Sequence, residues 1–191
     1  GNSGNNVLKG GDGNDYLQGA SGQDTLDGGA GNDTYVIGAA THVVVEGENQ
    51  GTDTVQSVLG WTLAANVENL VLTGAGATSG AGNELDNVLT GNAAANTLSG
   101  LAGNDTISSS DGNDILTGGA GADTLLGGEG NDLIVIGAFA DHAAGEVIVG
   151  DAGTDELRFT GATAGTLVLG ADVAVERVVI GTGTAAAAVL T

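Results

Sequence analysis

The chain contains no cysteine, proline or methionine, and aromatic residues make up only 3% of its 191 residues. The absence of cysteine excludes thiolate metal sites and cysteine nucleophiles. The scarcity of aromatic residues argues against an interior built from large side chains. Glycine, by contrast, occurs 37 times. These totals favour small residues stacked by backbone pairing, in one domain or two small ones.

Basic residues are also scarce, because three Lys and Arg face 24 Asp and Glu and give a formal charge of −21. This balance excludes nucleic acid as an ordinary partner and disfavours an acidic membrane surface. A chain of this charge is either disordered or neutralised by cations when it folds. The sequence therefore predicts positively charged ligands.

Long apolar runs are absent as well, so we expect no membrane span, which needs about 18 consecutive apolar residues. No cationic start followed by an apolar run indicates a cleaved export signal. The chain lacks methionine even at residue 1. We therefore expect it to be a piece of a longer protein that contains other domains.

Glycine and aspartate recur at an interval of nine residues. Residues 1–36 divide into the lines GNSGNNVLK, GGDGNDYLQ, GASGQDTLD and GGAGNDTYV. Residues 82–135 divide into GNELDNVLT, GNAAANTLS, GLAGNDTIS, SSDGNDILT, GGAGADTLL and GGEGNDLIV. Most lines have glycine at positions one and four, and Asp or Asn at position six precedes a large apolar residue at position eight. Two blocks with the same phase indicate a repeat architecture.

A longer repeat contains these lines. NDTYVIGA at 32–39 returns as NDLIVIGA at 131–138, and GTDTVQ at 51–56 returns as GTDELR at 153–158. We therefore expect one unit used twice, in which a nonapeptide array is followed by a less regular, strand-rich segment. The expected boundaries are a first array at 1–37, a connecting or capping segment at 38–81, a second array at 82–136 and a C-terminal capping segment at 137–191.

Positions seven to nine of each line have the alternation of a short strand, with the position-eight side chain pointing inward. One inward residue per strand predicts a thin aliphatic core. Its expected members are Leu8, Leu17, Leu26, Tyr35, Leu89, Leu98, Ile107, Leu116, Leu125 and Ile134.

The glycines between the strands fit a tight turn repeated every nine residues, because such turns need positive φ angles and close approach of neighbouring turns. The turns expose peptide carbonyl oxygens, and the aspartates add carboxylates. Ca²⁺ takes about six to eight hard oxygen ligands. Stacked turns therefore predict calcium sites, in which the ion shields carboxylates that would otherwise repel one another.

GGDGNDYLQ, GGAGNDTYV, GGAGADTLL and GGEGNDLIV match the pattern G-G-x-G-x-D-x-U-x at every defined position. The sequence thus resembles the RTX (repeats-in-toxin) calcium-binding family of secreted bacterial proteins, over about half of its length. The resemblance implies an all-β fold, a right-handed parallel β-roll (a β-solenoid) in which each line forms half a coil. It also implies several Ca²⁺ ions between coils.

The same resemblance implies that ligand pairs come from lines two apart. The pairs are Asp15 with Asp33, Asn6 with Asp24, Asp105 with Asp123 and Asp114 with Asp132, with Asn87–Asp105 and Asn96–Asp114 as poorer pairs. Asp155 and Asp53 would close further sites or cap their rolls. The turn residues implied to contribute oxygens are Gly10, Asp12, Asn14, Gly19, Ser21, Gln23, Gly28, Ala30, Asn32, Gly100, Ala102, Asn104, Asp111, Asn113, Gly118, Ala120, Ala122, Gly127, Glu129 and Asn131.

Two lines, GNELDNVLT and GNAAANTLS, lack glycine at position four and aspartate at position six. We therefore expect residues 82–99 to form an ion-poor start of the second roll. SSDGNDILT lacks its first two glycines, which weakens the prediction for its edge of the roll.

Several residues have simpler interpretations. The position-five asparagines fit turn preference, and an Asn ladder that binds ice or glycan is the alternative. His42 and His142 lack a second histidine at zinc-ligand spacing and are expected to be loop residues. Trp61 is expected in the core or a cap. The Ala-rich end at 182–191 fits a last strand, a helix or a truncated element. No G-x-S-x-G motif occurs, so we expect this fragment to be no enzyme.

The expected function is a calcium-binding module that folds on Ca²⁺ binding outside the cell and supports the secretion and stability of a larger exoprotein. Type I export from a bacterium is implied by the family resemblance. The alternative is an adhesive β-roll that binds extracellular polysaccharide, for which the row Thr90, Ser99, Ser108 and Thr117 is a hint. Alternate members of that row fall on opposite faces, which dilutes a continuous outward ladder.

Overall fold

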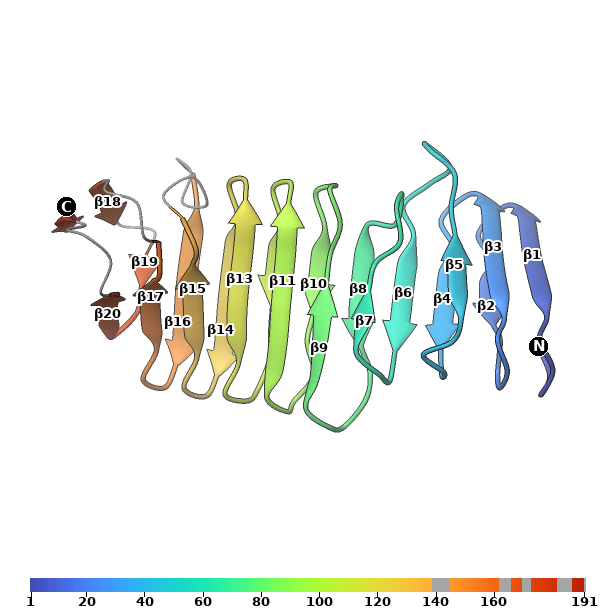
Figure 1. The fold of residues 1–191 in the computed structure, drawn as a ribbon, viewed down its shortest axis with the longest axis horizontal. Coiled ribbons are helices and arrows are strands. Elements are labelled where there is room, and N and C mark those ends of the chain that lie inside the picture. Colours follow the sequence, from blue (N-terminus) through green and yellow to red (C-terminus); the bar gives the residue numbers. More distant parts are fainter. Residues whose placement is uncertain (139–144, 162–165, 170–172, 182–186, 191) are drawn as a thin grey trace.

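The structure is a computed structural model that describes residues 1–138, 145–161, 166–169, 173–181 and 187–190. These residues form strands joined by turns, and no helix occurs among them. Accordingly, the described ranges contain no helix that is long and apolar enough to cross a bilayer. Figure 1 shows an elongated stack of strands that runs from the N-terminal β1 to the C-terminal end.

Three parallel sheets and one short strand pair make up the stack. The nine-stranded sheet contains, in spatial order, β2 (Tyr16–Gln18), β4 (Thr34–Ile37), β6 (Thr54–Ser57), β8 (Asn69–Leu72), β10 (Val88–Thr90), β12 (Thr106–Ser108), β14 (Thr124–Glu129), β16 (Val147–Ala152) and β19 (Val173–Ala174). The seven-stranded sheet contains β7 (Trp61–Thr62), β9 (Thr78–Ala81), β11 (Asn96–Ala102), β13 (Ile115–Ala120), β15 (Leu133–Ile136), β17 (Glu156–Phe159) and β20 (Arg177–Ile180). The three-stranded sheet contains β1 (Val7–Asp12), β3 (Thr25–Ala30) and β5 (Val43–Val45), and β18 (Thr166–Leu169) pairs with β21 (Ala187–Leu190).

Consecutive strands alternate between sheets, so that two strands and two turns make one coil. Within the arrays the register is 18 residues, as in the pairs Leu8↔Leu26 and Leu98↔Leu116. Outside the arrays the coils are less regular, and Tyr35 pairs with Val55 at a spacing of 20. The parallel β-solenoid that the family resemblance implies is thereby confirmed.

A row of apolar side chains from each sheet fills the space between the sheets. All the position-eight residues predicted to point inward are buried except Leu8, which packs at the edge of the core and is partly buried. Val44, Val55, Leu70, Ile148 and Leu157 continue the row through the segments outside the arrays. The burial pattern of strands such as β6 and β13 alternates between buried and partly exposed residues, as a half-buried strand requires.

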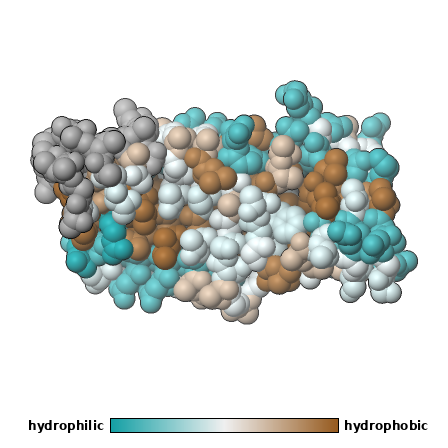
Figure 2. Space-filling model, viewed as in Figure 1, coloured by the Kyte–Doolittle hydropathy of each residue, from teal (hydrophilic) through white to brown (hydrophobic). Residues whose placement is uncertain are grey.

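The segment at 38–81 continues the solenoid between the two arrays, because β8 pairs with β10 and β9 pairs with β11. The side of the molecule opposite the nine-stranded sheet is divided between two sheets, one that ends at β5 and one that begins at β7. On the face shown in Figure 2, hydrophobic residues form separate patches among hydrophilic and neutral ones. His142 and residues 182–186 of the Ala-rich end lie outside the described residues, whereas 187–190 of that end form a strand.

Candidate metal centre

One position recurs in the solenoid, two residues before the inward-facing residue of a strand. We call this position the edge slot. In the nine-stranded sheet it is occupied by Asp15, Asp33, Asp53, Glu68, Asn87, Asp105, Asp123 and Glu146. In the seven-stranded sheet it is occupied from β11 onward by Asn96, Asp114, Asp132, Asp155 and Glu176, and in the three-stranded sheet by Asn6, Asp24 and His42. Position six of each nonapeptide therefore forms rows along the edges of the roll.

Hydrogen bonds connect the members of each row. The carboxylate of one coil accepts the backbone N–H of the edge-slot residue in the preceding coil, at 2.6–2.8 Å. Asp33, for example, accepts from Asp15, and its own N–H donates to Asp53. Because the acceptor is charged, such bonds are stronger than neutral ones. Each edge carboxylate is thereby fixed in position by the backbone.

The second oxygen of four of these carboxylates lacks a comparable partner. Asp33, Asp105, Asp132 and Asp155 are at most 2% exposed, and the Oδ2 atom of each is buried without a hydrogen-bond partner. The described ion pairs of Lys and Arg involve only Asp27 and Glu156, which lie outside the edge slot. A buried, ionised carboxylate without a counter-charge is strongly unfavourable. The rows are therefore consistent with bound cations.

The position-one glycines allow oxygens from two coils to approach each other. A Cβ atom on Gly10 would lie 2.5 Å from both Asp15 Oδ2 and the carbonyl oxygen of Gly28 in the next coil. A similar close approach occurs beside Gly100 and Gly127, where the aspartate is Asp105 or Asp132. A carboxylate oxygen and a peptide oxygen therefore lie together at each place, and both are hard donors that Ca²⁺ prefers. The residues present therefore fit a calcium ion.

The electrostatics agree with this geometry. Burial, together with the nearby carboxylates of Asp123 and Asp86, raises the pKa of Asp105 to about 6, against the hydrogen bond from Asn87, which lowers it. Burial likewise raises the pKa of Asp132 to about 6, with Asp114 and Asp155 as the repelling neighbours. Burial also raises the pKa of Asp53 and of Asp155. Without a cation, each of these groups resists ionisation.

The position-five side chains have a structural role. The Oδ1 atoms of Asn14, Asn32, Asn104, Asn113 and Asn131 accept the backbone N–H of the position-five residue in the following coil, at 2.8–3.0 Å. These side chains reach forward, whereas the edge carboxylates reach back. The contacts account for asparagine at position five without an ice-binding or glycan-binding ladder.

The structure separates the predicted turn residues into two groups. The position-one glycines Gly19, Gly28, Gly100, Gly118 and Gly127 are buried beside the edge slot. The side chains at positions three and five lie on the outer turns and are exposed or partly exposed, and these are Asp12, Asn14, Ser21, Gln23, Ala30, Asn32, Ala102, Asn104, Asp111, Asn113, Ala120, Ala122, Glu129 and Asn131. A role of their backbone oxygens in ion binding stays a prediction.

The lines that lack the glycines or aspartates of the nonapeptide pattern, at residues 82–99 and 109–117, have hydrogen bonds in their place. Asn87 accepts from the N–H of Asn83 and donates through Nδ2 to the carbonyl of Glu68, at 2.7 and 3.2 Å. Asn96 likewise accepts from Asn92 at 2.8 Å. Ser109 occupies the position-one slot, and its hydroxyl donates to the carbonyl of Gly127 at 2.5 Å. Neutral amide and hydroxyl groups thus satisfy the backbone where the aspartates or glycines are missing.

Four edge-slot residues were not predicted as such from the sequence: Glu68, Glu146, Glu176 and His42. Glu68 accepts the N–H of Asp53 and Glu176 accepts that of Asp155, at 2.7 and 2.8 Å. None of the four lies in a line that has glycine at positions one and four. The signal that could have identified the glutamates is an acid two residues before an apolar residue in a strand-like segment, as in Glu68–Asn69–Leu70.

His42 is buried, although the sequence predicts a loop histidine. It is 5% exposed, and its Nδ1 lies 3.5 Å from Asp24 Oδ2. His42 directly precedes β5, which pairs with β3, so it occupies the edge slot that follows Asp24. The three-stranded row therefore ends in an imidazole.

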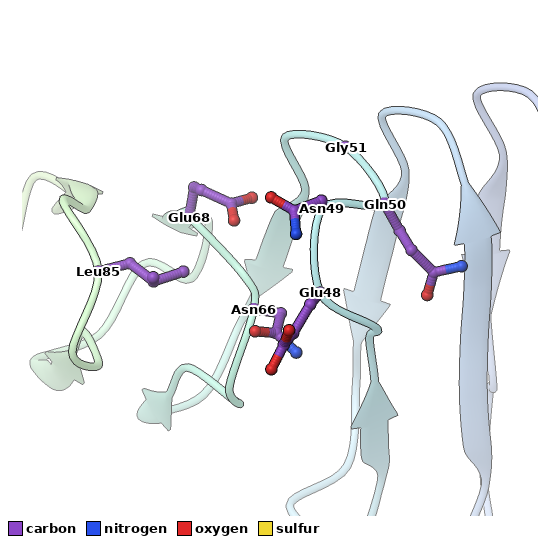
Figure 3. Close-up of a pocket in the computed structure, with 7 residues that line it drawn as sticks. All are labelled: Glu48, Asn49, Gln50, Gly51, Asn66, Glu68 and Leu85. Atoms are coloured by element: carbon purple, nitrogen blue, oxygen red, sulfur yellow. The ribbon is translucent and has the colours of Figure 1, made fainter.

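A polar hollow of about 360 Å³ lies on the edge of the segment at 38–81. Figure 3 shows Glu68 and Asn49 facing each other across it. The lining residues are Glu48, Asn49, Gln50, Gly51, Asn66, Glu68 and Leu85. The hollow extends the acidic edge beyond the first array.

Comparison with known proteins places this geometry in a family. The sequence model of the RTX calcium-binding nonapeptide repeat, which describes four copies, matches residues 1–35, 81–116 and 108–143. The matched residues make up just over half of the chain and include both arrays. No curated protein matches the sequence. The family is a calcium-binding repeat module and not a catalytic one, and the acidic edge rows are consistent with that activity. The chain belongs to the RTX calcium-binding nonapeptide repeat family.

Proposed function

We propose that this module binds several Ca²⁺ ions along its edge rows and folds as it binds them outside the bacterial cell. The observation that carries the proposal is the set of buried Oδ2 atoms of Asp15, Asp33, Asp105, Asp132 and Asp155, which have no hydrogen-bond partner. Beside Asp15, Asp105 and Asp132 this atom also lies close to a carbonyl oxygen of the next coil. The ligands are the pairs predicted from the sequence, to which Asp53 and Asp155 add their carboxylates. The arrays at 1–37 and 82–136 take up the ions, and the segments at 38–81 and 137–191 connect and cap them.

Calcium dependence of folding follows from the charge of the chain. The ion-free fold would stack carboxylates along each edge over a core that is one side chain thick. Ordering 37 glycines adds a large entropic cost. The free energy of ion binding is then the free energy of folding. In the cytosol, where Ca²⁺ is scarce, the chain stays unfolded and exportable, and outside it folds and stabilises the larger protein that it belongs to.

Far-UV circular dichroism during a Ca²⁺ titration tests the proposal, with Mg²⁺ as the control ion. We expect a transition from coil to β-structure at roughly micromolar to millimolar Ca²⁺. Mg²⁺ should not produce it, because that ion demands octahedral geometry and gives up its water reluctantly. A full β-spectrum in the presence of a chelator would refute calcium-dependent folding.

A second candidate function is binding of extracellular polysaccharide. The observation that favours it is a shallow hollow at the start of the seven-stranded sheet, where Trp61 lies among Ser79, Thr97 and Ser99. Aromatic faces and hydroxyl groups are suited to sugars. The row of Thr90, Ser99, Ser108 and Thr117 gives no added support, because Thr90 pairs with Ser108 in one sheet and Ser99 with Thr117 in another. Loss of glycan-array binding in Trp61→Ala, with calcium folding unchanged, would establish this function.

A further inference from the structure

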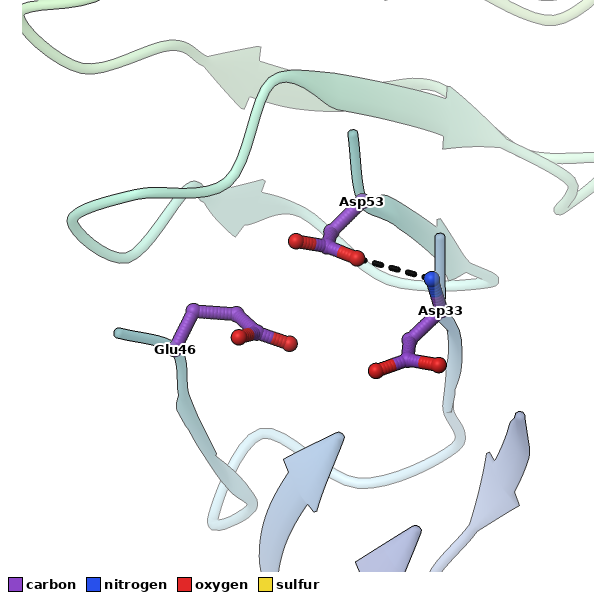
Figure 4. A group of neighbouring side chains, drawn as sticks. All are labelled: Asp33, Glu46 and Asp53. Atoms are coloured by element: carbon purple, nitrogen blue, oxygen red, sulfur yellow. Dashed lines mark hydrogen bonds between the residues drawn. The ribbon is translucent and has the colours of Figure 1, made fainter. Parts of the chain in front are cut away.

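Three carboxylates converge where the first array meets the following segment. Asp33 and Asp53 occupy successive edge slots of the nine-stranded sheet, and Glu46 directly follows β5. One carboxylate oxygen from each residue lies within 4.8 Å of the others. Figure 4 shows the three side chains pointing toward a common space from separate stretches of chain. Three like charges at this separation need a counter-charge.

Independent of the clustering, two of these groups present oxygens with no partner. Asp33 is 1% exposed, its Oδ1 accepts the N–H of Asp15, and its Oδ2 is buried without a hydrogen-bond partner. Glu46 Oε2 is buried and lacks a partner in the same way. Asp53 is also 1% exposed, and its Oδ1 is held by the N–H of Asp33 at 2.7 Å. The backbone therefore fixes the aspartates while other oxygens remain available to a ligand.

Tyr35 holds the third carboxylate. Its hydroxyl donates a hydrogen bond to Glu46 Oε1 and accepts the backbone N–H of Gly28 at 2.9 Å. The ring is fully buried in the core, and burial raises the pKa of the phenol, so the hydroxyl stays protonated and can donate. Glu46 is thereby oriented toward Asp33 and Asp53.

The second repeat unit has the same backbone arrangement without this constellation. Asp132 and Asp155 are linked as Asp33 and Asp53 are. In the register of the strands, however, the position of Glu46 is taken by Gly150 and that of Tyr35 by Ile134. The glutamate and the tyrosine are therefore a paired addition to one of two equivalent coils. Neither belongs to the nonapeptide pattern, in which position one is glycine and position eight is aliphatic in most lines.

We propose that Asp33, Glu46 and Asp53 form a three-carboxylate Ca²⁺ site that holds its ion more tightly than the two-carboxylate sites of the arrays. Calcium affinity rises with the number of charged ligands and with the rigidity of the site. Here the charge is one unit higher than at an Asp–Asp pair, and the third ligand is anchored by a core tyrosine. The inference rests on the proposed function for the identity of the ion. The competing arrangement is a shared proton in place of the ion, since burial raises the pKa of Glu46 and of Asp53.

Tb³⁺ is a suitable probe, because it takes the hard oxygen ligands of Ca²⁺ and emits when a nearby excited tyrosine transfers energy to it. Tb³⁺ is added to the full Ca²⁺-loaded chain, which is already folded, under excitation of tyrosine. We expect sensitised emission to appear with the first equivalent of Tb³⁺, because the site with three carboxylates has the strongest preference for a trivalent ion. Glu46→Gln, which has a side chain of the same shape, should raise the Tb³⁺ concentration at half-maximal emission by about tenfold. Tyr35→Phe should lower the emission without changing the number of bound ions, because it removes the donor that contacts Glu46 and leaves only Tyr16 and Trp61.

Glu84→Gln is the matched control. Glu84 is exposed and lies outside the edge rows, and its substitution removes the same charge, so it should leave the emission curve at the wild-type position. An unchanged curve in Glu46→Gln, or full emission in Tyr35→Phe, would overturn the three-carboxylate site. If the carboxylates shared a proton in place of an ion, Glu46→Gln would leave the emission curve unchanged. Failure of the proposed function is separate, since it appears in the circular dichroism of the wild-type chain with Ca²⁺ and chelator before any Tb³⁺ is added.

Discussion

The carboxylate of Asp132 should destabilise the ion-free fold and stabilise the calcium-bound fold, and the two effects can be measured separately. The residue is 2% exposed, its Oδ1 accepts the N–H of Asp114, and its own N–H donates to Asp155, both at 2.8 Å. The substitution Asp132→Asn keeps the shape and an acceptor oxygen but removes the charge. We expect this change to stabilise the ion-free fold and to weaken the calcium-bound one.

The size of the effect follows from the pKa. Burial raises the pKa of Asp132 from 3.8 to about 6 in the folded chain. Each pKa unit corresponds to about 1.4 kcal/mol, so at pH above both values the ionised carboxylate destabilises the ion-free fold by about 3 kcal/mol. Asp132→Asn removes this penalty. In Ca²⁺, the same variant lacks a charged ligand that Asp132 would share with Asp114 and Asp155, so its folding midpoint should move to higher Ca²⁺.

Both effects can be measured by circular dichroism. In chelator, folding is induced with trimethylamine N-oxide, which favours compact states, and Asp132→Asn should fold at lower osmolyte concentration than the wild type. In a Ca²⁺ titration the order should reverse. Asp132→Ala also leaves the N–H of Asp114 without an acceptor, which costs about 1–3 kcal/mol, so it should be less stable than Asp132→Asn in both conditions. A variant Asp132→Asn that is less stable in chelator, or that has an unchanged calcium midpoint, would refute the reasoning.

Three further predictions concern the buried carboxylates in the absence of Ca²⁺, the turn glycines and the hydrogen bonds of the position-five asparagines. In chelator, lowering the pH from about 7 to about 5 should increase the β-content. The pKa values of Asp105 and Asp132 in the folded chain are about 6 and exceed the ordinary value of 3.8, so the folded chain binds more protons and its stability falls as the pH rises through this window. A loss of β-signal on acidification would contradict this prediction. Gly130→Ala should lower the stability of the calcium-loaded chain by about 2 kcal/mol or more in urea unfolding, because φ is +136° and the new Cβ would overlap a carbonyl of the neighbouring coil. The control Gly76→Ala, with open space around the new Cβ, should change stability by less than about 1 kcal/mol. Asn131→Ala, which removes the acceptor of one amide in the next coil, should cost about 0.5–1.5 kcal/mol in the same assay, and no loss would show that water replaces the bond.

The regular part of the fold could be predicted because each line repeats the same local requirements. Leu98 and Leu116 stand 18 residues apart in the sequence and are partners in the sheet. The spacing of nine, with one inward residue per strand, determines both the strand positions and the pairing. The same count places the aspartates in rows, since the residue two before each inward side chain must lie at the edge.

The irregular segments could be predicted less well, because their turns differ in length and lack the glycines. Val55 pairs with Tyr35 at a spacing of 20, and Glu156 pairs with Leu133 at a spacing of 23. A search for glycine lines therefore overlooks the coils in which Glu68 and Glu176 continue the rows. Glu46 could not be found from spacing at all. Its role depends on the reach of its side chain from position one toward two aspartates, and on the hydroxyl of Tyr35 that holds it there.

The 18-residue register constrains how such a chain can change length. A gain or loss of two lines leaves every downstream strand in its sheet, whereas a single line moves each of them to the opposite side. The internal duplication carries this signature: NDTYVIGA and NDLIVIGA are separated by 99 residues, and β4 lies in the nine-stranded sheet while its counterpart β15 lies in the seven-stranded sheet. The outward surfaces of the two copies consequently face away from each other. Any binding surface inherited by both copies would make the module a two-sided cross-linker instead of one enlarged patch.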